Sequence, residues 1–154
     1  MNLPPYKYNG ARSMVILHEI EMRKFIETWK VAREQAVMLP ETDDPSYLSL
    51  DHLVQHVLRA ARGYMVWMCE NLGLPDPGIP AAPPAELIAG EVDTYLDSVL
   101  SGWRDPLKAI VEDRFEEVFL SRWKVAYCVD AMMEHAVMHP IRHRFQLENL
   151  MKSD

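Results

Sequence analysis

The chain has 154 residues, of which 49% are hydrophobic and 25% charged, a length and composition typical of one globular domain with its own core. Its formal net charge of −7 argues against a general nucleic-acid binder or a protein held on anionic membranes, because both need a clustered positive face. The sequence holds no run of about 18 apolar residues, and residues 1–13 lack the apolar segment of a secretory signal, so we expect neither a membrane span nor a signal peptide.

The first periodic stretch, from Ser13 to about Leu39, predicts an amphipathic helix. Serine is a residue type that caps helix N-termini, and Pro40 stands where a proline would stop the helix. Apolar residues recur between these ends at every third or fourth position, and they define the face that we expect to be buried: Met22, Phe25, Trp29, Ala32 and Ala36.

A second helix is predicted after the turn-rich segment that ends at Tyr47. Ser49 is its expected N-cap, and Asp51 lies in the first turn, where the positive end of the helix dipole favours an acidic side chain. Gly73 marks the C-terminus, since glycine readily adopts the left-handed conformation that ends a helix. The apolar stripe of this helix consists of Leu53, Val57, Ala60, Tyr64 and Trp67.

The second half of the chain begins with a proline-rich connection. Five prolines lie between Leu74 and Pro84, which excludes a helix there and predicts a stiff segment that crosses one end of a helical bundle. A third helix is expected from Ala85 to about Gly102. Residues 107–121 are either a helix tail or an irregular crossing, and a fourth helix is expected from about Arg122 to Lys152.

Strand signals are weak, because valine and isoleucine are scattered at helical spacing and no Asn-Gly or Asp-Gly hairpin turn occurs. Four amphipathic helices without strands predict an all-α fold, a four-helix bundle formed by a single domain over residues 1–154. The two cysteines, Cys69 and Cys128, lie far apart and form no paired motif, which favours a reducing, cytoplasmic setting.

Three histidines lie on one face of the fourth predicted helix. His135, His139 and His143 are spaced by four residues, and each such step turns only about 40° around a helix axis. Two imidazoles one turn apart are a common way to chelate a metal ion. The alternative is a pair of surface histidines without a ligand. The same arc collects Cys128, Met132, Gln146 and Leu150.

His56 on the second helix is the third candidate ligand. It lies within about 60° of Leu53 around the helix axis, inside the apolar arc. If this face meets the fourth helix, His56 joins His139 and His143 in a site with three nitrogen ligands. Three protein ligands leave one coordination position open, which is the pattern of catalytic zinc. The alternative is a hydrogen-bonded histidine of the core.

The last of these helices resembles the signature of the DinB/YfiT-like proteins, a family of small four-helix proteins with the pattern His-x-x-x-His-Arg-Gly-Gln. His139, His143, Arg144 and Gln146 match this pattern, and Phe145 replaces the glycine. The segment from residue 50 to residue 57 is similar to the family's second-helix ligand segment, with His56 in the ligand position.

The resemblance implies a site for zinc, nickel or another divalent ion on His56, His139 and His143. Related members include metal-dependent hydrolases and thiol-dependent transferases that use mycothiol or bacillithiol, so a small-molecule substrate or a thiol cofactor is expected. Dimers are common in the family, and we expect a homodimer. The alternative function is a non-catalytic, stress-related dimeric interaction protein that binds metal. A bundle that binds an apolar ligand without metal is a third reading.

Several neighbours of the predicted site have open roles. His135 is a fourth ligand, a proton shuttle or a hydrogen-bonded core residue. Asp51 and Glu91 either accept a hydrogen bond from a ligand's ring N–H or serve as solvated and capping residues. Pro140 is expected to kink the fourth helix, and the kink either aims His139 at the metal or is a bend around the core.

Overall fold

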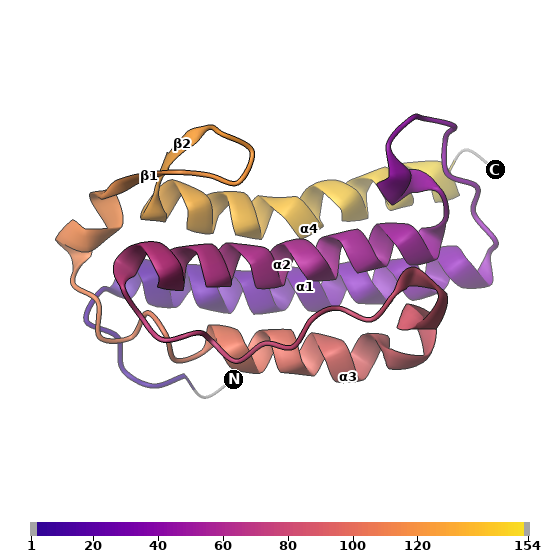
Figure 1. The fold of residues 1–154 in the computed structure, drawn as a ribbon. Coiled ribbons are helices and arrows are strands. Elements are labelled where there is room, and N and C mark those ends of the chain that lie inside the picture. Colours follow the sequence, from indigo (N-terminus) through magenta and orange to yellow (C-terminus); the bar gives the residue numbers. More distant parts are fainter. Residues whose placement is uncertain (1–2, 153–154) are drawn as a thin grey trace.

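The computed structural model describes residues 3–152, and in this part the chain forms four long helices, two short 3-10 helices and one small hairpin. Figure 1 shows the long helices side by side. The prediction of a mostly helical, all-α fold is therefore confirmed. None of the described helices is both long and apolar enough to cross a membrane. The elements are α1 (Asn9–Glu34), η1 (Pro45–Tyr47), α2 (Leu50–Leu72), α3 (Ala85–Trp103), η2 (Glu112–Glu116), β1 (Val118–Leu120), β2 (Ala126–Cys128) and α4 (Val129–Met151).

Helix α1 begins and ends earlier than its sequence pattern predicts. Ser13 is not the N-cap: it lies inside the helix, where its hydroxyl donates to the Asn9 carbonyl at 3.0 Å. The C-terminus is set by Ala36, which adopts a left-handed backbone with φ of 53°. The N–H of Val37 donates to the Ala32 carbonyl at 3.0 Å, which closes a Schellman motif. Because alanine is not a residue type that marks the end of a helix, the sequence pattern placed the C-terminus near Pro40, several residues after the observed end at Glu34.

Helix α2 has the ends that the sequence predicts. The Ser49 hydroxyl accepts a hydrogen bond from the His52 N–H, and Asp51 lies in the first turn. At the other end, Gly73 has a left-handed φ of 69°, and the N–H of Leu74 donates to the Cys69 carbonyl at 2.8 Å. Side-chain capping and a glycine stop are local devices, so they can be recognised without knowledge of the fold.

The proline-rich connection after α2 runs along the helices instead of crossing one end, which corrects the prediction (Figure 1). Gln55 donates to the Pro83 carbonyl and Arg62 to the Ile79 carbonyl, both at 2.9 Å, so the segment retraces α2 towards its start. At about 3.1 Å per residue its 11 residues span roughly 34 Å. That exceeds the roughly 28 Å length of a 19-residue helix, so α3 can run parallel to α2.

The segment between α3 and α4 contains an antiparallel hairpin that the sequence did not predict. In β1 and β2, Val118 pairs with Cys128, and Lys124 in the turn adopts a left-handed φ of 64°. The Ser121 hydroxyl accepts from the Val125 N–H at 3.0 Å and supports this turn. As a result α4 begins at Val129, not Arg122, and Cys128 is its cap rather than part of its inward face.

The core lies between the helices and brings α2 against α4. The predicted stripes of α1 and α2 are buried, apart from partly exposed Ala60 and exposed Ala36. Two indole N–H groups tie α2 to its neighbours: Trp29 donates to the Leu50 carbonyl at 2.8 Å, and Trp103 donates to the Ala61 carbonyl at 3.0 Å. These bonds satisfy the polar edge of side chains that are otherwise packed on all sides. The packing fixes which face of α2 is directed at α4.

Candidate metal centre

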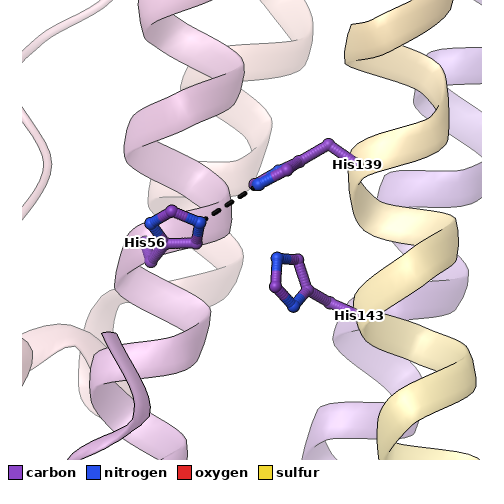
Figure 2. Close-up of side chains that lie close together, drawn as sticks. All are labelled: His56, His139 and His143. Carbon is purple, nitrogen blue, oxygen red and sulfur yellow. Dashed lines mark hydrogen bonds between the residues drawn. The ribbon is translucent and has the colours of Figure 1, made fainter. Parts of the chain in front are cut away.

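The structure brings His56 of α2 together with His139 and His143 of α4. One ring nitrogen from each side chain lies within 4.8 Å of the other two, and Nε2 of His56 is 3.1 Å from Nε2 of His139. Figure 2 shows the three rings directed into the space between the two helices. The sequence placed these residues on inward faces, and the packing of α2 against α4 makes them neighbours.

The donor set has the chemistry and spacing to hold a metal ion. Zinc binds imidazole nitrogen at about 2.0–2.1 Å, which separates two ligands of a tetrahedral site by roughly 3.3 Å. The 3.1 Å between the nitrogens of His56 and His139 is close to that separation. The Nε2 atom of His143 is buried and has no hydrogen-bond partner within residues 3–152. A buried lone pair without a donor is costly unless a cation or water binds it.

Burial keeps the three imidazoles neutral. His139 and His143 are only 5% and 3% exposed. Removal from water, together with the smaller effects of the neighbouring His143 and His56, lowers the pKa of His139 to about 2. Burial also lowers the pKa of His143, to about 4, and that of His56. At neutral pH each ring therefore offers a lone pair, which is the state that binds metal.

Gln146 and Tyr47 hold the ring of His143. The Nδ1 atom of His143 lies 2.8 Å from the Gln146 side-chain oxygen, which also accepts from the Tyr47 hydroxyl at 2.9 Å. Because an amide oxygen only accepts, Nδ1 of His143 must carry the proton and Nε2 the lone pair. Such a partner fixes the tautomer and the orientation of a metal ligand. By contrast, Nδ1 of His139 is buried without a partner among the described residues.

Other residues near the predicted site have different roles. His135 lies outside the group of three, with its ring stacked on Trp123 at a centroid distance of 5.4 Å. His52 is 2.8 Å from the Ser49 hydroxyl at the start of α2. Asp51 pairs with Arg33 at 3.1 Å instead of supporting a ligand.

Two further expectations concern α3 and α4. Glu91 is exposed on α3, which does not contribute to the group, so of its two expected roles the solvated one agrees with the structure. Helix α4 continues through Pro140 to Met151, and Pro140 is buried beside His139. Because proline has no N–H, the carbonyl four residues earlier loses its helical donor.

The three histidines line an open cavity of about 500 Å³. Its wall also contains Asp44, Tyr64 and Arg142. The Asp44 carboxylate accepts from the Ser46 N–H at 2.9 Å, and that hydrogen bond lowers the pKa of Asp44. Burial raises the pKa of Tyr64 to about 12, so its hydroxyl keeps its proton at neutral pH. The site thus combines three neutral imidazoles that could bind a metal ion with an accessible volume, one proton-bearing hydroxyl and one carboxylate.

Sequence reasoning missed part of this site. The family pattern identifies Gln146 as a matching residue but not as the hydrogen-bond acceptor of His143. Its position three residues after His143, on the same helix face, is the signal that could have revealed this role. Tyr47 ends the short helix η1 and Asp44 caps it, in a segment where no periodic pattern places a side chain. Only the folded loop brings them to the cavity.

Comparison of the chain with protein-family models, with curated proteins and with solved structures found no match in any of the three. The family resemblance therefore depends on the residues of α2 and α4 themselves.

Proposed function

We propose that this chain is a DinB/YfiT-like four-helix bundle and a metal-dependent enzyme, with zinc or nickel held by His56, His139 and His143. The reaction is hydrolysis or a thiol-dependent transfer of the mycothiol or bacillithiol type. The observation that carries the proposal is the meeting of three neutral imidazoles from two helices within 4.8 Å, at the wall of an open cavity.

An open cavity favours catalysis over a purely structural ion. Structural zinc sites are closed by four protein ligands, whereas catalytic sites keep a position for water or substrate. Here the group has three members, and the space beside them is about 500 Å³. When bound, a divalent ion supplies Lewis acidity and lowers the pKa of a water or thiol at the open position.

The side chains around the histidines suit a reaction that develops negative charge. The Tyr64 hydroxyl retains its proton and has no hydrogen-bond partner within the described chain, so it is free to donate to a substrate oxygen. Asp44 is a weak proton acceptor, because the Ser46 N–H stabilises its ionised form. Gln146 orients His143 and is a positioning residue.

Metal analysis of protein purified without an affinity tag tests this proposal. We expect about one zinc or nickel ion per chain in the unmodified protein and none in a His139→Ala, His143→Ala double variant. His52→Ala is the matched control, since this histidine is on α2 but outside the group. Protein that binds no more zinc or nickel than the double variant does would overturn the metal site. Ester, amide and thiol-transfer panels then separate the two reaction classes.

A second candidate is a non-catalytic, metal-binding, dimeric interaction protein. Exposed apolar side chains on α1 and α4 favour it: Leu17 and Ile20 are 44% and 38% exposed, and Met138 and Phe145 are 56% and 53% exposed. Exposed apolar surface is a feature of protein interfaces. Metal-loaded protein that is dimeric by light scattering and inactive in every panel would favour this candidate over the enzyme.

A further inference from the structure

A second hollow continues the metal-centre cavity along α2. It has a volume of about 310 Å³ and shares His56, Tyr64 and Trp123 with the cavity around the three histidines. We call this second hollow the aromatic cleft. Because the two volumes have three lining residues in common, a molecule bound in the cleft lies beside the histidine group. The cleft is therefore placed to hold the part of a substrate that does not react.

The walls of the aromatic cleft suit a planar apolar group. Tyr64 and Trp67 of α2 face the hairpin, where Trp123 meets Tyr64 at a ring-centroid distance of 6.3 Å. The Trp67 indole donates to the Leu120 carbonyl at 3.0 Å, which fixes the orientation of that ring. A cavity of about 150 Å³ admits one benzene ring, so 310 Å³ has room for two fused rings.

The charged residues around the cleft are mostly arginines. Arg59 and Arg122 line the cleft, and Arg142 lines the metal-centre cavity beside it. Arg59 and Arg142 make no ion pair or hydrogen bond with any residue between 3 and 152, and Arg122 lies 3.7 Å from exposed Glu70. The chain has a net charge of −7, so two arginines in one hollow and a third in the adjoining cavity depart from its average charge. Unpaired guanidinium groups are suited to binding an oxyanion.

We infer that the aromatic cleft binds a substrate that combines a planar apolar group with an organic oxyanion, a carboxylate or a phosphate. Tyr64, Trp67 and Trp123 hold the planar group, and Arg59 and Arg142 hold the oxyanion. This inference rests on the proposed function, since the cleft is the substrate side of the metal centre. It adds the chemical class of the substrate, which the three histidines alone do not define.

Calorimetric titration of the zinc-loaded protein with three probes that share a naphthalene ring tests the inference. The probes are 2-naphthoate, 2-naphthyl phosphate and neutral 2-naphthamide. We expect at least one anion to bind roughly tenfold or more tightly than the amide, and Arg59→Gln and Arg142→Gln each to weaken the anion by roughly tenfold. Arg33→Gln is the control for lost charge, because Arg33 lines neither cavity. The anion that binds more tightly identifies the source of the oxyanion.

The planar group has its own pair of variants. Trp123→Ala is expected to weaken all three probes, whereas Val125→Ala, in the same exposed turn, leaves them unchanged. The inference is wrong if the folded protein binds no probe, if the amide binds as tightly as both anions, or if Arg33→Gln weakens the anions as much as Arg59→Gln does. Equal effects of Trp123→Ala and Val125→Ala also contradict it.

Repeating the titrations after chelation separates the two proposals. Anion binding that keeps its dependence on Arg59 in metal-free protein supports the cleft, and it does so even if metal analysis disproves the metal centre. Anion binding that disappears with the metal shows that the ion and not the arginines holds the anion, and it overturns the cleft while the metal site stands.

Discussion

Gln146 offers a sharp test of how the chain prepares a metal ligand. Its side-chain oxygen accepts from Nδ1 of His143 at 2.8 Å and from the Tyr47 hydroxyl at 2.9 Å. The change Gln146→Leu keeps the approximate size of the side chain and removes the acceptor. The ring of His143 is then left with the Tyr47 hydroxyl, 3.5 Å away, which is too long for a good hydrogen bond.

The loss of this acceptor frees both the tautomer and the rotation of the His143 ring. Changes to such supporting residues reduce metal affinity by about 10- to 100-fold, or about 1.4–2.7 kcal/mol. Because Gln146 itself is exposed, the stability of the metal-free protein is expected to fall by no more than about 1 kcal/mol. Metal affinity and folding should therefore respond differently.

Zinc affinity is measured by competition with a chelating indicator, and metal-free stability by urea unfolding. Gln146→Glu is the conservative variant, because a carboxylate still accepts from Nδ1, and it should bind zinc at least as well as the unmodified chain. Tyr47→Phe keeps the Gln146 acceptor and should lose less than Gln146→Leu does. A zinc affinity of Gln146→Leu within about twofold of the unmodified protein would refute the positioning role, since the expected loss is about tenfold or more.

Histidines outside the site and the left-handed residues at helix ends provide three other predictions. His135→Ala should keep stoichiometric zinc and lose less than about tenfold in affinity, because its ring lies outside the ligand group. His18→Leu should stabilise the metal-free protein by about 1–3 kcal/mol at pH 7 in urea unfolding, because both ring nitrogens of His18 are buried without partners. Ala36→Gly should raise the free energy of unfolding by about 1 kcal/mol, and Gly73→Ala should lower it by about as much, since both positions have left-handed backbones.

The stabilisation by His18→Leu also depends on pH. Burial lowers the pKa of His18 from 6.5 to about 3, so the folded protein keeps this ring neutral while the unfolded chain takes up a proton. Stability is lost as the pH falls from 6.5 towards 3. Between pH 7 and pH 5 the advantage of His18→Leu should grow by about 2 kcal/mol, and an advantage that does not change would contradict this account.

The variants of His135, Gly73 and Ala36 each have an outcome that would contradict the prediction made for them. Loss of stoichiometric zinc in His135→Ala would make that residue a fourth ligand. The methyl group that Gly73→Ala adds has no neighbour within 4 Å. A change in the free energy of unfolding of this variant therefore reports backbone strain and not a steric clash. If Ala36→Gly is destabilising, the left-handed conformation at residue 36 does not limit stability.

Local features of the sequence determined the helical character of this chain and the candidate ligands. The spacing of His139 and His143 places both on one face of any helix that contains them, and His56 falls in an apolar arc in the same way. The Ser49 cap and the Gly73 stop act over four or five residues, so they could be predicted. The alanine stop at residue 36 could not, because alanine has no preference for a left-handed backbone.

Only the tertiary structure decided which of these faces meet. Periodicity describes one helix at a time, whereas the 3.1 Å contact between His56 and His139 depends on how α2 packs against α4. The prolines of residues 74–84 predicted a stiff connection. Its path along α2, however, depends on contacts with residues distant in the sequence, such as Gln55. Arg59 of α2 and Arg142 of α4 likewise come from elements far apart in the chain. Such juxtapositions are long-range, and for that reason no short stretch of sequence contains them.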